Sequence, residues 1–142
     1  MQAIIDRATL ISMVLICAVL SGCASFTPKE LADLDYGHYP FDYKEIIQQH
    51  LNRSLKDPAS AILDYRGSPA TVWQKGSIFG SRDYGWGVCV FINAKNSYGG
   101  YVGERPYFFL IRDGKIIRTY GEMETNLFDT ALAQGGCKRV GG

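Results

Sequence analysis

The sequence has almost no net charge, few histidines and no concentrated basic segment. Lys and Arg together number 15 and Asp and Glu 14 among the 142 residues, so the formal net charge is +1. Nucleic-acid binding usually needs a clustered basic face, and we therefore expect no nucleic-acid partner. Because His38 and His50 are its only histidines, the chain cannot build a histidine-rich metal site, and we expect neither a metal nor a cofactor.

Common catalytic motifs are also missing. The chain contains no GxSxG, HExxH, CxxC, Walker-type or Ser-x-x-Lys pattern. Its carboxylates near expected turns are scattered, which is more typical of a solvated rim than of an acid/base pair. They are Asp83, Glu104, Asp113, Glu122 and Glu124. We therefore expect a protein that is not an enzyme. The alternative is a small periplasmic hydrolase, either thiol-dependent, with Cys89 as nucleophile and His50 as base, or of another kind.

Long hydrophobic runs are absent as well. Residues 8–20 (ATLISMVLICAVL) form an apolar segment of 13 residues, whereas a membrane-spanning helix needs about 18–20. The shorter length is typical of the hydrophobic region of a signal peptide. An uncleaved N-terminal anchor is the alternative, and Asp6 is unusual in the segment that precedes such a region.

Leu20-Ser21-Gly22-Cys23 follows this segment directly and resembles the lipobox of bacterial lipoproteins. Small residues before the cysteine give a peptidase access to the backbone, and the Cys23 thiol can accept diacylglycerol. Several acyl chains make a stable anchor, whereas one chain binds only marginally. We therefore predict that residues 1–22 are a lipoprotein signal peptide. Cys23 is the predicted lipid attachment site, through which the protein is held to a membrane.

The residues after Cys23 indicate the destination. Ala24, not Asp, follows the cysteine. In the sorted lipoproteins of Gram-negative bacteria, which this segment resembles, a residue other than Asp implies transfer to the outer membrane. We expect a periplasm-facing, lipid-anchored protein of the outer membrane, with the inner membrane as the alternative. Residues 23–41 contain two prolines and little periodicity, so we interpret them as a lipidated tether with a helical turn near residues 29–34.

Two of the four cysteines remain after this processing. Cys17 would be removed with the signal peptide and Cys23 would carry lipid, which leaves Cys89 and Cys137. In an oxidising periplasm such a pair usually forms a disulfide. The bridge would close a loop of roughly 49 residues and stabilise the fold by about 4 kcal/mol in the chain-entropy model. Two separate buried thiols are the alternative.

Residues 42–138 predict one small periplasmic α+β domain. Asp42 and Glu45 are spaced like a capping box, apolar residues then recur at helical spacing, and Pro58 limits this helix to about residue 56. Strands are expected at residues 61–66, 70–74, 85–93, 107–112 and 115–120, with a turn at 67–69, a loop at 75–84 and a hairpin turn at 113–114. A second helix is expected at residues 122–134, ended by Gly135 and Gly136.

These elements predict an N-terminal helix packed on a three- or four-stranded antiparallel meander. The short C-terminal helix is expected on the same face or at an edge. In the central strand, Val88, Val90 and Ile92 point to one face, and Cys89 and Phe91 point to the other. Because both sets are apolar, we expect both faces of this strand to be covered.

Residues 93–101 (NAKNSYGGY) are the most unusual part of the domain, because a polar, glycine-containing segment joins two buried strands. One interpretation is a long hairpin connection in which Asn side chains cap their own backbone. The other is a recognition loop. Its candidate residues are Asn93, Lys95, Asn96, Tyr98 and Tyr101. Turn chemistry alone explains these residue types, so we favour the first interpretation.

Three segments of the chain resemble known sequences: residues 36–47 (YGHYPFDYKEII), 55–61 (LKDPASA) and 87–111 (GVCVFINAKNSYGGYVGERPYFFLI). They resemble a group of small, largely uncharacterised lipoproteins of Gram-negative bacteria. The resemblance covers most of the chain after Cys23, and its KDPxSA and NAKNSYGGY-like segments are distinctive, although Ala59 stands where an acidic residue is expected. It implies an envelope location and a domain type, and it implies no reaction.

The sequence therefore predicts a non-catalytic, membrane-anchored lipoprotein of the bacterial envelope. The tether, the small domain and the loop rich in Tyr, Asn and Lys motivate a binding role, with another envelope protein or a glycan as partner. Besides the hydrolase, a secreted accessory protein encoded by a phage or plasmid is an open alternative.

Overall fold

The computed structural model describes residues 27–75, 82–121 and 127–142. The predicted signal peptide and Cys23 lie outside these residues, as do part of the predicted loop at 75–84 and the first residues of the predicted helix at 122–134. The chain divides into two units, Met1–Ala32 and Asp33–Gly142, and each is described by itself. Among the described helices, none has the length and apolar character needed to cross a membrane.

In the first unit, the described residues form one short helix, α2 (Pro28–Ala32). A reciprocal capping box closes its start, because the Thr27 amide donates to Glu30 Oε2 (2.7 Å) and the Glu30 amide donates to Thr27 Oγ1 (3.2 Å). Pro28 suits the first helical position, where an N–H would have no partner. The helix predicted at 42–56 is therefore not the N-terminal one, since α2 precedes it.

The second unit is built on a four-stranded antiparallel sheet in the order β1-β2-β3-β4. Its strands are β1 (Ile62–Lys75), β2 (Arg82–Asn93), β3 (Arg105–Arg112) and β4 (Lys115–Tyr120). Each strand pairs with the next one along the chain, which confirms the α+β class and the antiparallel meander. The hairpin turn is confirmed too. Asp113 and Gly114 join β3 to β4 with φ of 50° and 68°, the positive values that a two-residue turn requires.

β1 corrects the prediction of two short strands separated by a turn. It is one strand of 14 residues, and its register against β2 shifts between Arg66 and Ala70. Residues 67–69 face a shorter stretch of β2 there, as in a β-bulge. Gly67 has a φ of +74°. The Gly-Ser-Pro sequence that predicted a turn therefore marks an irregularity inside a continuous strand.

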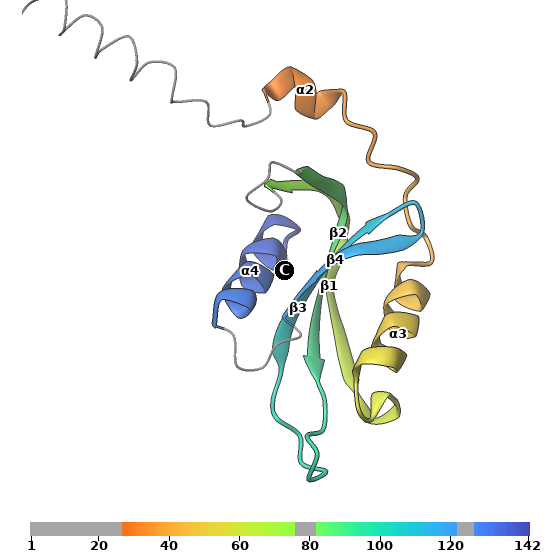
Figure 1. The fold of residues 1–142 in the computed structure, drawn as a ribbon, viewed down its shortest axis with the longest axis vertical. Helices are drawn as coiled ribbons and strands as arrows, with labels where there is room; N and C mark the ends of the chain where they lie inside the picture. Colours follow the sequence, from red (N-terminus) through yellow and green to blue (C-terminus); the bar gives the residue numbers. More distant parts are fainter. Residues whose placement is uncertain (1–26, 76–81, 122–126) are drawn as a thin grey trace, which may run out of the picture. The chain divides into compact units, whose positions relative to one another are not determined.

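One face of the sheet is covered by α3 (Tyr43–Ser54) (Figure 1). Ile47 and Leu51 of this helix are fully buried. They share a core with apolar residues of β2 and β3, namely Val88, Val90, Ile92, Tyr107, Phe109 and Ile111. α3 begins after Asp42, where the sequence predicted its start, but the Asp42 side chain makes no capping hydrogen bond. Packing of the apolar face is thus the main stabilisation of this helix.

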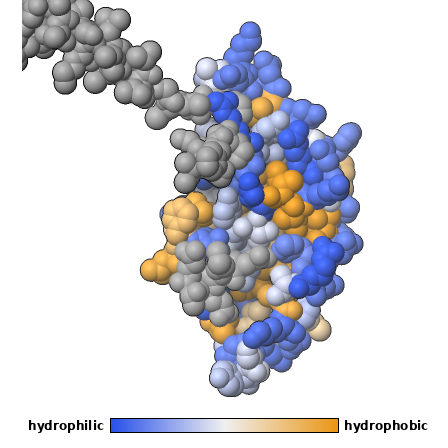
Figure 2. All heavy atoms as spheres, in the orientation of Figure 1, coloured by the Kyte–Doolittle hydropathy of each residue, from blue (hydrophilic) through white to orange (hydrophobic). Residues whose placement is uncertain are grey.

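The opposite face is covered by α4 (Leu127–Arg139) (Figure 1), which corrects the prediction of a C-terminal helix on the same face or at an edge. Its Ala133 and Cys137 pack with a second core. The sheet residues of that core are Val72, Cys89, Phe108 and Leu110. β2 therefore alternates as predicted, with one set of side chains toward α3 and the other toward α4. Both faces of the strand are covered. On the side of the molecule shown in Figure 2, the described surface is mostly hydrophilic, with hydrophobic residues in smaller patches.

α4 continues through Gly135 and Gly136, where the sequence predicted its end. Glycine is needed within the helix because a Cβ on Gly136 would overlap the ring of Phe108 on β3. Glycine at this position lets the helix backbone lie directly against the sheet. The helix reaches Arg139, and Val140 beyond it is also buried, so the packed core extends past residue 138.

A disulfide joins Cys89 of β2 to Cys137 of α4, with a Cα–Cα distance of 4.9 Å. It confirms the predicted pair and replaces the alternative of two separate thiols. Both residues are buried, at 0% and 3% exposed. The bridge lies inside the second core and joins the C-terminal helix covalently to the second strand of the sheet.

Residues 36–41, at the end of the predicted tether, pack on the domain. The Trp86 indole N–H donates to the Gly37 carbonyl oxygen at 3.0 Å, and the Tyr39 and Trp86 ring centroids lie 5.0 Å apart. Pro40 is buried. A tether that extends to residue 41 is therefore too long, because the compact unit already begins at Asp33.

Candidate functional site

The connection between β2 and β3 is a structured loop held by its own backbone. Lys95 and Tyr101 form an isolated antiparallel bridge, and inside it the Asn96 amide donates to the Gly100 carbonyl oxygen at 2.8 Å. The Asn96 side-chain oxygen accepts from the amides of Tyr98 (2.9 Å) and Gly100 (3.1 Å). Asn96 thus fixes the tip of the loop by bonding nearby backbone amides, as asparagine side chains commonly do in turns.

Asn93 has a similar role at the base of the loop. Its side-chain oxygen accepts from the Gly103 amide at 3.0 Å, and Gly103 has a φ of +90°, a backbone conformation that suits glycine. The two asparagines therefore cap the backbone, as the hairpin interpretation predicts. Of the five candidate recognition residues, these two have their side-chain oxygens committed to the loop itself.

The aromatic residues of the loop differ in exposure and in contacts. The Tyr101 hydroxyl donates to the Ser60 carbonyl oxygen at 3.0 Å, and Lys95 Nζ lies 5.4 Å from the centre of the Tyr101 ring. The hydrogen bond ties the loop to the short 3-10 helix η1 (Pro58–Ser60), and the Lys95 contact lies within the loop. Tyr98, in contrast, is 96% exposed. The loop therefore holds one tyrosine as a brace and presents the other to solvent.

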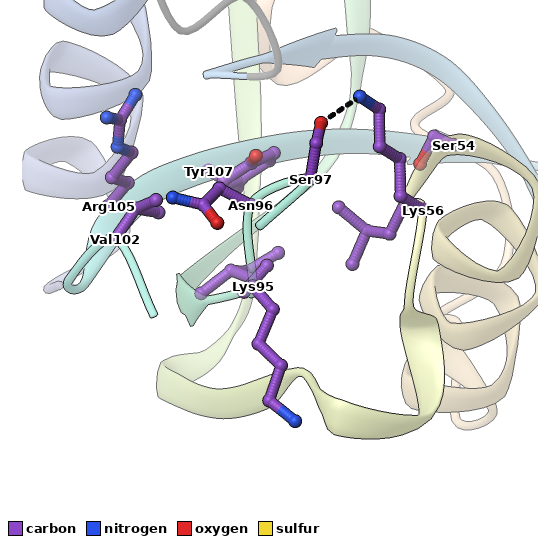
Figure 3. Close-up of a pocket in the computed structure, with 11 residues that line it drawn as sticks. Ser54, Lys56, Lys95, Asn96, Ser97, Val102, Arg105 and Tyr107 are labelled. Carbon is purple, nitrogen blue, oxygen red and sulfur yellow. Dashed lines mark hydrogen bonds between the residues drawn. The ribbon is translucent and has the colours of Figure 1, made fainter. Parts of the chain in front are cut away.

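A contact that the sequence did not indicate joins the loop to the end of α3. Lys56 Nζ donates a hydrogen bond to Ser97 Oγ (Figure 3). The two residues are 41 positions apart in the chain; Lys56 lies in the KDPxSA segment and Ser97 in the NAKNSYGGY-like segment. A pairing across this separation depends on the register of β2 and on where α3 ends, so no local pattern could have indicated it.

A hollow of about 250 Å³ lies between this loop and the end of α3, and we call it the loop hollow. Buried Ile92 and Tyr107 contribute apolar surface to it, and Lys56, Lys95 and Arg105 contribute positive charge. None of the residues that line it is a carboxylate. In Figure 3 Lys95 points away from Lys56 and Arg105, and the charged ends of the three side chains lie apart. The positive charge is thus spread around the hollow and does not converge on one point.

A second hollow, of about 340 Å³, lies between α3 and the β3–β4 turn and is lined by His50, Arg53 and Lys115 among others. The His50 ring makes a T-shaped contact with Phe109 at 5.8 Å, in the core that faces α3. Cys89 belongs to the core that faces α4, and its sulfur is bonded to Cys137. The structure therefore does not bring His50 and Cys89 together as a base and a nucleophile.

The scattered carboxylates form surface ion pairs where the structure describes them. Asp83 bonds Arg118 at 2.6 Å, and Glu104 lies 3.8 Å from Arg66. Hydrogen bonding to Asp83 raises the pKa of Arg118. Glu122 and Glu124 lie outside the described residues. Over the described ranges, no three His, Cys, Asp or Glu side chains gather as they would around a metal ion.

One side chain under α3 has a strongly shifted ionisation. Burial raises the pKa of Tyr65 to about 12, with smaller contributions from Tyr43 and Glu45. The rings of Tyr65 and Tyr43 meet edge to face at 5.8 Å, and Lys44 Nζ lies 5.3 Å from the Tyr65 ring centre. This group joins β1 to the first turn of α3, and none of its residues lines the loop hollow.

The five candidate recognition residues thus lie in or next to one structured loop, with Tyr98 the more exposed of its two tyrosines. The structure adds Ser97 within the loop and Lys56 and Arg105 beside it. The predicted lipid attachment site, Cys23, lies outside the described residues. Comparisons of the chain with models of protein families, with curated proteins and with solved structures find no match.

Proposed function

We propose that this chain is a non-catalytic lipoprotein of a Gram-negative envelope, anchored to the outer membrane through Cys23 and facing the periplasm. Its domain binds another envelope component, protein or glycan, with the β2–β3 loop and the loop hollow. The observation that carries this proposal is the fixed loop tip, in which Asn96 holds the backbone on either side of a fully exposed Tyr98.

A rigid loop is a favourable carrier for a binding residue. Ordering a flexible loop and its side chains opposes association, so a loop that is already held by hydrogen bonds loses less entropy on binding. Tyrosine offers a large amphipathic surface with few rotatable bonds, and it is enriched among the residues that dominate interfaces. The bonds from Asn93, Asn96 and Tyr101 give Tyr98 such a support.

The charge beside the loop indicates the chemistry of the partner. Three cationic side chains and no carboxylate line the loop hollow, so a ligand that carries acidic groups is attracted and one that carries basic groups is repelled. Because the charged ends of these side chains lie apart (Figure 3), a partner with several separated acidic groups fits better than one small anion. An acidic glycan strand or an acidic surface of an envelope protein meets this description.

Two further observations support the envelope location. The buried Cys89–Cys137 disulfide is typical of proteins that fold in an oxidising compartment. The lipobox-like segment that ends at Cys23 and the three segments similar to Gram-negative lipoproteins point to the same compartment. The proposed assembly is then a lipid anchor, a short linker and a sheet braced by α3 and α4 that carries the loop.

Site-specific photo-crosslinking in cells tests the binding role. A photoreactive residue replaces Tyr98, and the matched control replaces Thr71, which is exposed on β1 and away from the loop. We expect a discrete crosslinked product from position 98, absent from position 71 and weakened when Lys56→Ala is added. If positions 98 and 71 give the same products, or if position 98 gives none, the loop is not a recognition surface.

A further inference from the structure

Aromatic side chains gather where the chain enters the second unit. The Tyr39 ring centroid lies 5.0 Å from that of Trp86 and 4.8 Å from that of Phe41. Tyr36 meets Tyr84 edge to face at 6.1 Å. We call these five residues the entry cluster. They come from the segment before α3 and from the first half of β2.

Packing accounts for only part of this cluster. Tyr39 and Trp86 are partly buried, and the Trp86 N–H has a partner in the Gly37 carbonyl, as a structural latch requires. Phe41 is 86% exposed. Phe41 is exposed at the rim of a group of partly buried rings, so together they form an apolar patch of the kind that contacts a partner or a membrane.

The position of the predicted anchor indicates what covers the cluster. Cys23 precedes Tyr36 by 13 residues, and a chain of this length spans at most roughly 45 Å when fully extended. The acyl chains at Cys23, which belong to the proposed function, therefore keep the entry cluster within reach of the bilayer. Tyrosine and tryptophan are enriched at the membrane–water interface, where an apolar ring and a polar group are both accommodated.

We propose that the entry cluster is a second membrane contact, which docks on the headgroup region of the bilayer that holds the lipid anchor and inserts Phe41. Asp35, Asp42 and Asp113 flank the cluster together with Lys44 and Arg112. With charges of both signs at the rim, the contact depends on apolar insertion. It does not require anionic headgroups, and it is insensitive to salt.

This docking orients the recognition loop. Trp86 and Asn93 belong to the same strand, and at about 3.3 Å per residue they are separated by roughly 20–25 Å. Figure 1 shows the β2–β3 loop at one end of the sheet and the segment that enters α3 toward the other end. A domain held to the membrane by its entry cluster therefore presents Tyr98 away from the lipid surface.

Fluorescence quenching in vesicles tests the proposal. The acylated full chain with Trp73→Phe retains Trp86 as its only tryptophan, because the sequence has two. It is reconstituted in phosphatidylcholine vesicles whose acyl chains are brominated near the headgroup. We expect loss of Trp86 fluorescence relative to unbrominated vesicles, at low and at high salt. Phe41→Ser should remove most of this loss, whereas Tyr98→Ser, at the other end of β2, should leave it unchanged.

A second measurement avoids any effect of Trp73→Phe on folding. A photoreactive residue at position 41 in the otherwise unchanged acylated chain should crosslink to lipid, and one at position 98, at the exposed tip of the β2–β3 loop, should not. An acylated, vesicle-bound chain with unquenched Trp86 and no lipid adduct at position 41 would overturn the docking and leave the lipid anchor intact. A mature chain without acyl groups would overturn both. An adduct with a second copy of the chain would assign the cluster to self-association instead.

Discussion

Gly136 of α4 lies so close to Phe108 of β3 that a Cβ at this glycine would overlap the aromatic ring. Gly136→Ala should therefore force the helix away from the sheet and lower the free energy of unfolding by about 1–3 kcal/mol, as overpacking of a core does. Urea denaturation measures the change.

The adjacent glycine supplies the control. A Cβ on Gly135 meets nothing within 4 Å, so Gly135→Ala should raise stability by about 0.5–1 kcal/mol through its higher helix propensity. Equal effects of the two substitutions would contradict the close approach of α4 to β3.

The disulfide between Cys89 and Cys137 leaves neither cysteine with a free thiol. In the mature protein, neither should react with an alkylating reagent until a reductant and a denaturant are added, because both are buried. The double variant Cys89→Ala/Cys137→Ala should lose about 2–5 kcal/mol of stability. Mass spectrometry of the labelled protein checks the first expectation and urea denaturation the second. Labelling of Cys89 without reductant would favour the thiol-dependent alternative.

Asn96 and Tyr98 should separate loop structure from recognition. Asn96→Ala removes the acceptor of two backbone amides. Each of these hydrogen bonds contributes no more than about 0.5–1.5 kcal/mol, so the variant should have a modestly lower free energy of unfolding. It should also weaken partner capture. Tyr98→Ala should abolish capture with unchanged stability, because the side chain is exposed. Denaturation and quantitative crosslinking of the two variants measure both effects. Loss of stability in Tyr98→Ala would show that the residue is structural.

Tyr65 should make the domain sensitive to alkaline pH. Its pKa is about 12 in the folded chain, raised by burial, and about 10 in the unfolded chain. The unfolded state therefore releases the phenol proton first, so this contribution to stability is complete below pH 10 and is lost as the pH rises toward 12. Urea denaturation between pH 8 and pH 11 follows the loss. In Tyr65→Phe, which cannot ionise, the decline should be smaller.

Cys23→Ser tests the anchor separately from the domain. The substitution removes the thiol that we propose accepts lipid, so acylation should cease and the protein should leave the membrane fraction. Mass spectrometry of the N-terminus and fractionation of cells measure the two outcomes. Unchanged membrane association would favour an uncleaved N-terminal helix.

Several features followed from local patterns because their causes are local. The alternation of β2 follows from the two-residue period of a strand, and Val90 and Cys89 lie on opposite faces as expected. The Asp113-Gly114 turn follows from the need for positive φ. In the loop, Asn96 bonds its neighbours as turn chemistry predicts. The cysteine pair followed from counting cysteines in a presumed oxidising compartment.

Other features depend on partners that are distant in the chain. A glycine such as Gly136 is typical of a helix end, but here it lies within the helix because the Phe108 ring packs against it. Gly67 is typical of a turn, yet the residues on both sides of it continue to pair with β2. Lys56 meets Ser97 across 41 residues, and Trp86 fixes Gly37 across 49. In each case the local sequence around a glycine or a polar residue is compatible with two structures, and tertiary packing determines which one forms.

The register shift in β1 has a consequence for aggregation. β1 is an edge strand of 14 residues, and a long, regular edge is a template on which another chain can add a strand. The irregularity at residues 67–69 divides this edge into two shorter stretches, and Pro69 within it has no amide hydrogen to donate. If the proposed lipid anchor concentrates the protein on a membrane surface, its copies meet frequently. An interrupted edge would let its neighbours lie side by side without joining into a continuous sheet.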